Sequence, residues 1–138
     1  MDVLSSRILL RPRDLERSRR FYRDVLGLAV YREFGPPDSP GMVFFLGPGF
    51  LEISGGHSPG TDAVPEAPAD SEGPMIWLQV RDVRAEHERL AAAGVTISRG
   101  PREEPWGLIE MWITDPESLR IVLVEVPEAH PLRRDQRT

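Results

Sequence analysis

The chain has 138 residues, of which 40% are hydrophobic and 28% are charged, a composition typical of one compact globular domain. Its formal net charge of −5 argues against a nucleic-acid partner, because binding to phosphates depends on concentrated lysine and arginine. The absence of cysteine excludes disulfides, thiolate metal sites and cysteine nucleophiles. Apolar runs are short, and arginines interrupt the N-terminal segment where a leader would be apolar, so we expect no membrane partner and a cytoplasmic location.

The first part of the chain predicts one strand, one helix and three further strands. Asp14 is placed to cap a helix over Leu15 to Leu26, on which apolar side chains recur at helical spacing and which Gly27 ends. Short apolar runs between proline and glycine turns predict the strands, at residues 6–10, 28–34, 42–46 and 50–54.

The same order of elements is then repeated. Residues 55–74 are rich in glycine, proline, alanine and acidic residues, the composition of a linker. Asp82 precedes a helix predicted at residues 83–93, and Gly94 follows it. Strands are predicted at residues 75–80, 95–98, 108–114 and 119–126. The repeat indicates an internal duplication.

The sequence therefore predicts an α+β fold of two tandem βαβββ modules, at residues 5–54 and 75–126, within one domain spanning residues 1–126. One face of each small sheet packs against its helix. The other face has to be covered by the second module of the same chain or of a partner. Two curved sheets that face each other enclose a cavity, where we expect the functional site. Residues 127–138 show no periodicity and are predicted to form a mobile tail.

Three motifs carry a resemblance to a known superfamily: DLERSRRFYRDVLGL at residues 14–28, FLEI at 50–53 and TDPE at 114–117. With the paired modules, they resemble the vicinal oxygen chelate superfamily, which contains glyoxalase I, extradiol dioxygenases, fosfomycin resistance proteins and bleomycin-resistance binding proteins. The likeness covers about residues 5–126 and is closest in character to the metal-free bleomycin-resistance type. One departure is Ser118, which stands in the late turn where the family commonly has a glycine of positive φ. Because this fold carries unrelated activities, the function has to be argued from the site.

The metal-dependent members that the sequence resembles take ligands from four strand positions, and these fall on Arg7, Glu52, Met75 and Val122. Only Glu52 suits a hard divalent cation, since valine has no donor atom, methionine is soft and arginine repels the ion. The histidines lie elsewhere, at positions 57, 87 and 130. We therefore predict no metal and no other cofactor.

Glu52 lies in the middle of an apolar strand, where a carboxylate needs a cation, a hydrogen-bond donor or a shifted pKa. Strand alternation turns it away from the helix, and the resemblance places Arg7 on the same face. We hypothesise that the Arg7 guanidinium takes the volume of the absent metal and pairs with Glu52, with a bidentate contact as one arrangement. The alternative is that both groups are simply hydrated.

Strand alternation brings aromatic and apolar side chains to the same cavity, where they suit a planar or conjugated ligand, although each aromatic taken singly also fits a packed core. The expected ligand-binding set is Arg7, Leu9, Phe34, Val43, Phe45, Phe50, Glu52, Met75, Trp77, Gln79, Leu108, Glu110, Trp112 and Val122. Trp106 falls in a loop and is expected to act as a lid or turn residue.

These features favour a protein that binds and sequesters a small aromatic or hydrophobic molecule, of the drug-resistance type. The resemblance implies ligand sites between the two subunits of a homodimer. An enzyme of the glyoxalase or dioxygenase type is the alternative, either with unrecognised metal ligands or metal-free, with Glu52 or Glu110 as general base and Arg7 stabilising an enolate-like anion. A non-catalytic ligand sensor is a third hypothesis.

Overall fold

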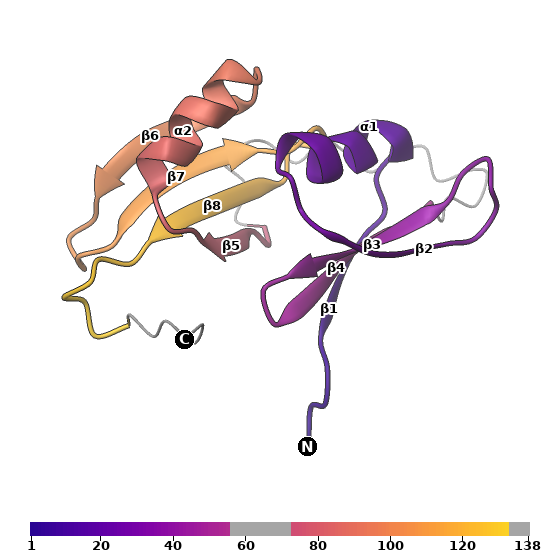
Figure 1. Cartoon of the computed structure of the whole chain (residues 1–138), viewed down its shortest axis with the longest axis horizontal. Helices are drawn as coiled ribbons and strands as arrows, with labels where there is room; N and C mark the ends of the chain where they lie inside the picture. Colours follow the sequence, from indigo (N-terminus) through magenta and orange to yellow (C-terminus); the bar gives the residue numbers. More distant parts are fainter. Residues whose placement is uncertain (56–72, 133–138) are drawn as a thin grey trace. The chain divides into compact units, whose positions relative to one another are not determined.

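The computed structural model describes residues 1–55 and 73–132, which form two compact units, one on each side of residues 56–72 in the sequence (Figure 1). Each unit consists of one four-stranded mixed sheet and one helical segment. The predicted α+β fold with two βαβββ modules is thus confirmed. Most of the linker predicted at residues 55–74 and His57 within it lie outside the described residues.

The first module contains a sheet with strand order β1-β4-β3-β2, in which β1 runs parallel to β4 and the other pairs are antiparallel. Its elements are β1 (Arg7–Leu10), α1 (Leu15–Arg20), a π-helical turn η1 (Phe21–Val25), β2 (Val30–Phe34), β3 (Gly41–Leu46) and β4 (Gly49–Ile53).

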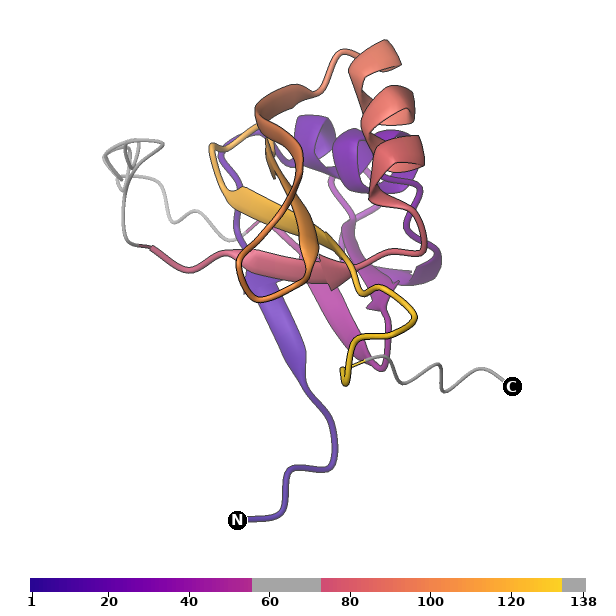
Figure 2. The same ribbon diagram turned by 90° about the vertical axis from the view of Figure 1, so that its left-hand side faces the viewer.

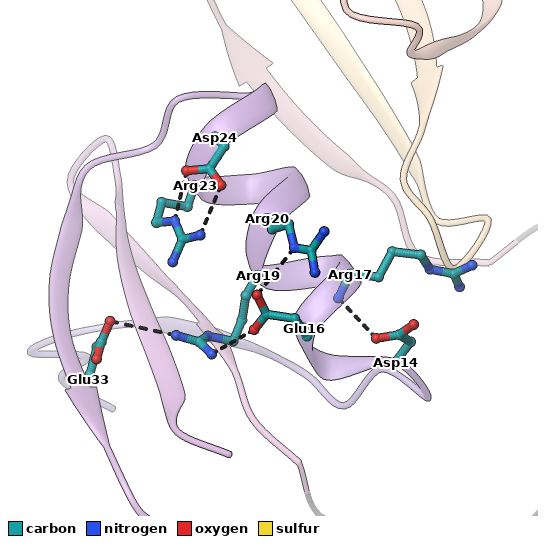
Figure 3. A network of polar contacts seen from close by, with 8 residues as sticks. All are labelled: Asp14, Glu16, Arg17, Arg19, Arg20, Arg23, Asp24 and Glu33. Carbon is teal, nitrogen blue, oxygen red and sulfur yellow. Dashed lines mark hydrogen bonds and ion pairs between the residues drawn. The ribbon is translucent and has the colours of Figure 1, made fainter. Parts of the chain in front are cut away.

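The predicted first helix is present as α1 followed directly by η1, and its ends are set by local chemistry. The Asp14 carboxylate accepts a hydrogen bond from the Arg17 backbone N–H at 3.0 Å, and Gly27 ends the segment with a φ of +74°. Glu16 accepts hydrogen bonds from Arg19 at 2.9 Å and Arg20 at 3.2 Å, as Figure 3 shows.

Arg19 also ties the helix to the sheet. Its Nη2 lies 3.7 Å from the carboxylate of Glu33 on β2, and its side chain is only 11% exposed (Figure 3). Arg23 pairs with the neighbouring Asp24 at 2.8 Å. Much of the positive charge of this arginine-rich helix is therefore balanced within the first module.

The core of the first module lies between the helical segment and one face of the sheet. The Tyr22 ring is 5.0 Å from Phe21 and 6.3 Å from Phe44, measured between ring centroids. The strand residues of this core are fully buried and alternate along β3 and β4: Met42, Phe44, Leu51 and Ile53. Within residues 1–55, no helix covers the opposite face of the sheet.

The second module has the matching strand order β5-β8-β7-β6. Its elements are β5 (Ile76–Gln79), α2 (Val83–Ala92), β6 (Thr96–Glu103), β7 (Ile109–Thr114) and β8 (Arg120–Glu125). Figure 2 gives a second view of α2 and its sheet. Met111, Ile113 and Ile121 on the strands of this sheet are fully buried.

The second helix is capped as predicted. The Asp82 carboxylate accepts from the Ala85 N–H at 2.9 Å, and Gly94 follows with a φ of +78°. The Glu125 carboxylate at the end of β8 also accepts from the Val83 N–H at 2.9 Å, which joins the start of the helix to the sheet.

Strand β6 runs to Glu103, well beyond the prediction of residues 95–98. The strand includes Gly100 and Pro101 and accommodates them through shifts in register between Ile97 and Arg99 and between Arg99 and Arg102.

In the turn before β8, Ser118 adopts the positive φ that the resemblance implies for a glycine at this position. Ser118 has a φ of +67°. The Asp115 carboxylate accepts from the backbone N–H groups of Glu117 at 2.9 Å and Leu119 at 2.8 Å. These bonds hold the turn and offset the strain at Ser118.

The first part of the predicted tail contacts the loop before β7. His130 Nε2 lies 2.9 Å from the Trp106 carbonyl oxygen, and the Leu132 N–H donates to His130 Nδ1 at 3.1 Å. Because Nδ1 accepts, the proton lies on Nε2 and is donated to Trp106. Residues 133–138 lie outside the described residues, so the mobility of the tail remains a prediction.

Candidate functional site

The sheet face opposite the helix, called here the open face, carries the sequence-predicted site residues of the first module. Strand register places Arg7, Phe50 and Phe45 in one row across β1, β4 and β3. The neighbouring row consists of Leu9, Glu52, Val43 and Arg32. Phe34 lies opposite Gly41 on the same face, so all seven predicted residues of this module come together.

Three aromatic rings form a cluster on this open face. The Tyr31 ring centroid is 5.1 Å from that of Phe45 and 5.0 Å from that of Phe50, and Phe45 is 5.7 Å from Phe50. Tyr31 is 51% exposed and Phe45 is 42% exposed. Tyr31 was missed by the sequence reasoning because the register shifts between Val30 and Arg32, and this bulge turns Tyr31 to the open face.

Arg7 and Glu52 form the hypothesised ion pair beside this cluster. Arg7 Nη1 donates to Glu52 Oε2 at 2.8 Å, and the guanidinium carbon lies 5.8 Å from the centre of the Phe50 ring. The Glu52 side chain is 14% exposed, whereas that of Arg7 is 37% exposed. The carboxylate therefore has a cation as its partner, held by one hydrogen bond and not in a bidentate contact.

The residues at the four positions that the resemblance assigns to metal ligands do not suit a divalent cation. Glu52 is already bound to Arg7, Met75 offers only a thioether, and Val122 offers no donor atom. Within residues 1–55 and 73–132, no three His, Asp or Glu side chains gather closely enough to hold a metal ion. His57 lies outside this part of the chain, so the absence of a metal site remains a prediction.

The open face of the second module is more tightly packed. Leu108, Val122, Val124 and Val126 form a buried apolar cluster, against which Trp112 packs. Leu108 and Val122, both predicted to line the site, are 6% exposed and belong to this cluster.

Three further predicted residues, Met75, Trp77 and Gln79, follow one another on alternate positions at the edge of the second sheet. Trp77 pairs with Val122 in register, and Gln79 pairs with Val124. Met75 lies just before β5, is 53% exposed, and shares the open face with Trp77, which is 51% exposed. An exposed indole is therefore available at this edge.

Trp112 lies under two arginines. The guanidinium carbon of Arg99 is 4.0 Å from the Trp112 ring centre, and that of Arg120 is 4.6 Å away. Since the two guanidiniums already lie over the indole, Trp112 is less available for stacking on a ligand than its sequence position suggested.

Two buried carboxylates lie beside these arginines. Glu104 binds Arg99 and also accepts from Arg102 Nε at 3.2 Å, while Glu110 Oε2 lies 3.9 Å from Arg99 Nη2. Glu104 is 5% exposed and Glu110 is 8% exposed. Glu104 was not predicted, because the bulges of β6 that bring Arg99 and Arg102 to it have no clear signal in the sequence.

The two carboxylates differ in proton affinity. Burial raises the pKa of Glu110, and the charge of Glu104 adds to this, against the opposing effects of Arg99 and of a hydrogen bond from Trp106. Burial also acts to raise the pKa of Glu104, but the hydrogen bond from Arg102 and the charges of Arg99 and Arg102 outweigh it and lower the pKa. Glu110 is thus the carboxyl of this face that takes a proton more readily.

Residues 5–123 match the Glyoxalase/Bleomycin resistance protein/Dioxygenase superfamily. The chain belongs to this superfamily. A lactoylglutathione lyase of Haemophilus influenzae is 30% identical over 123 residues, which cover 85% of this chain and 88% of the relative.

Solved structures of the superfamily fold agree with this assignment. SMU.1112c is 25% identical, with a TM-score of 0.71 over 91% of this chain and 99% of that chain. TnmS3, an antibiotic binding protein from Streptomyces sp. CB03234, is 19% identical, with a TM-score of 0.68 over 91% and 98%. At this identity the likeness establishes the fold only.

The superfamily thus includes lyases, dioxygenases and antibiotic-binding proteins. Within the described part of this member, no helix is long and apolar enough to cross a membrane.

Proposed function

We propose that this protein binds and sequesters a small planar or conjugated molecule against its aromatic open faces, without a metal. The observation that carries the proposal is the partly exposed cluster of Tyr31, Phe45 and Phe50 beside the Arg7–Glu52 pair. Exposed aromatic rings on a rigid sheet provide apolar contact area with little loss of side-chain entropy. The similarity to an antibiotic binding protein supports the same class of function.

The second module supports the proposal through Trp77. Its indole is 51% exposed and lies beside the apolar cluster, so a planar ligand that covers it gains buried area. Of the other predicted lining residues, Leu9, Met75 and Gln79 supply apolar and amide groups next to these rings, whereas Val43 is fully buried.

Isothermal titration calorimetry of the full chain with anthraquinone-2-sulfonate, phenazine and naphthalene-2-carboxamide tests the binding. We expect saturable heat with at least one of these planar probes, weakened about tenfold or more in Phe45→Ala, since truncation removes a contact ring. Ile8→Ala is the matched control, because Ile8 is also 42% exposed but pairs with Leu51, whose side chain faces the helix. No saturable binding of any probe would count against the proposal.

We also propose that the protein is a homodimer and is located in the cytoplasm. Partly exposed aromatic and apolar residues on both open faces are suited to burial against a second subunit. Light scattering behind size-exclusion chromatography measures the mass directly, and a monomer at micromolar concentration contradicts the dimer. Cell fractionation tests the location.

An enzyme of the lyase or dioxygenase type is the second candidate, favoured by the 30% identical lactoylglutathione lyase and by the raised pKa of Glu110. Glu110 or Glu52 would act as general base, with Arg7 stabilising an anionic intermediate. A lactoylglutathione lyase assay distinguishes a metal-free enzyme from a metal-dependent one. It is run on protein treated with chelator, and again after addition of Zn²⁺, Ni²⁺ or Mn²⁺. Chelator-resistant activity lost in Glu110→Gln supports the metal-free enzyme, and metal-dependent activity overturns the metal-free assignment.

A further inference from the structure

Arg32 is a positioned guanidinium on the first open face. It lies opposite Val43, and its guanidinium carbon is 5.5 Å from the centre of the Phe34 ring. Phe34 in turn lies over Gly41, where a Cβ atom would come within 2.5 Å of the ring. The missing side chain at Gly41 therefore makes room for Phe34, and Phe34 supports Arg32.

The second module has an arginine at the matching position. Arg99 follows the register shift in β6 and lies opposite Trp112, as Arg32 follows the shift in β2 and lies opposite Val43. Arg99 is bound by Glu104 and approached by Glu110. In contrast, Arg32 is exposed and makes no ion pair within residues 1–55 and 73–132.

Two carboxylates account for the difference. Glu104, which follows β6, forms the hydrogen-bonded pair with Arg99, and Glu110 on β7 lies 3.9 Å from Arg99. Glu110 precedes Trp112 by two residues in β7, and Gly41 precedes Val43 by two residues in β3. The position of the second carboxylate is therefore occupied in the first module by a glycine. Arg32 stacks on a ring there but has no acid from the facing strand.

Among the residues that the structure describes, the charge balance of the first open face is consequently positive. Glu52 balances Arg7, which leaves the charge of Arg32 next to the aromatic cluster, although the chain as a whole has a net charge of −5. Val43, opposite Arg32, and Phe45, in the cluster, are two positions apart on β3 and point to the same side, about 7 Å apart along the strand. The row of the sheet that carries Arg32 is therefore adjacent to the row that carries Phe45.

We propose that the ligand is a planar aromatic carboxylate, whose ring lies on the Tyr31–Phe45–Phe50 cluster and whose carboxylate is bound by Arg32. This inference rests on the proposed function and adds the chemical class of the ligand. A guanidinium presents its N–H donors in a planar fork that matches the two oxygens of a carboxylate, and no ion pair within residues 1–55 and 73–132 uses the donors of Arg32.

Calorimetry with three probes that share one ring system tests the assignment: naphthalene-2-carboxylate, naphthalene-2-carboxamide and naphthalen-2-ylmethylammonium. We expect the carboxylate to bind about tenfold or more tightly than the amide, and the ammonium to bind most weakly. Arg32→Gln should reduce the preference for the carboxylate to about twofold or less, with Arg32→Lys intermediate. Arg84→Gln, an exposed arginine on α2, changes the net charge equally and should retain the preference.

The outcomes separate the two proposals. If the amide binds as tightly as the carboxylate, or if Arg32→Gln keeps the preference, the carboxylate assignment is wrong while ring binding stands. If none of the naphthyl probes binds while anthraquinone-2-sulfonate or phenazine does, the carboxylate assignment fails and the binding function stands; if no probe of either set binds, both fail. Circular dichroism of each variant confirms that a lost preference does not come from a lost fold.

Discussion

The two modules have the same strand order and matching helix caps, yet the side chains of their open faces are arranged differently. In the first module the aromatic rings are partly exposed, and the Arg7–Glu52 pair is open to solvent at its arginine. In the second, Glu104 and Glu110 are buried and Trp112 lies under two guanidiniums. The two modules thus share a backbone fold. The side chains on the open face of the second module stabilise that module, and those on the open face of the first module remain exposed.

The largest loss of stability should come from replacing Arg99, the cation that binds Glu104 on the second open face. An exposed ion pair contributes about 1 kcal/mol or less, whereas removing one partner of a buried pair costs about 3–5 kcal/mol. We therefore expect Arg99→Met to lower the free energy of unfolding several times more than Arg7→Met, as measured by urea denaturation. Arg84→Met serves as the exposed control. Equal losses for Arg99 and Arg7 would remove the distinction between the two faces.

The next effect concerns the glycine that distinguishes the first face. Gly41→Ala places a methyl group within 2.5 Å of the Phe34 ring, so the ring and the arginine above it must move. We expect a loss of about 1–3 kcal/mol in unfolding free energy and weaker binding of naphthalene-2-carboxylate. Gly100→Ala, where the nearest atom is 3.9 Å away, is the control and should change neither quantity strongly. Unchanged stability and binding in Gly41→Ala would show that Phe34 is not fixed by this contact.

The helices and the assignment of faces could be predicted from the sequence because their causes are local. Asp14 and Asp82 cap the helices through their own side chains, and the apolar residues of β3 and β4 alternate regularly. This alternation placed Phe50 and Glu52 correctly on the open face.

What the sequence could not predict depends on strand pairing. A bulge in β2 turns Tyr31 to the open face, and the bulges in β6 carry Arg99 and Arg102 to Glu104. A simple count of alternate residues fails at such positions, because one extra residue reverses the faces that follow. Pairing with the partner strand also decides that Val122 is buried while Trp77 is exposed.

A smaller predicted effect concerns the pH dependence of stability, to which the two carboxylates of the second open face contribute in opposite directions. Because the folded-state pKa of Glu110 is raised, its contribution to stability is fully present below its unfolded pKa and is lost as the pH rises through the folded value. The pKa of Glu104 is lowered, so its contribution is present above the unfolded value and is lost as the pH falls. Glu110→Gln should therefore gain stability relative to the wild type as the pH rises from 4 to 7 in urea titrations. Glu88→Gln, on the exposed side of α2, controls for the loss of one carboxylate. A constant difference between Glu110→Gln and the wild type would contradict the assignment.

The smallest expected effect compares the two turns that lead into β4 and β8. Gly47 in the first module and Ser118 in the second both have positive φ, +58° and +67°. A non-glycine residue in this conformation costs about 1–2 kcal/mol, while a glycine costs about 0.5–1 kcal/mol in chain entropy. Ser118→Gly should therefore raise the free energy of unfolding by up to about 1 kcal/mol, and Gly47→Ala, which meets no atom within 4 Å, should lower it by a similar amount. If Ser118→Gly is destabilising, the Ser118 side chain makes a favourable interaction that outweighs the backbone strain, and the two turns then differ in more than their residue at this position.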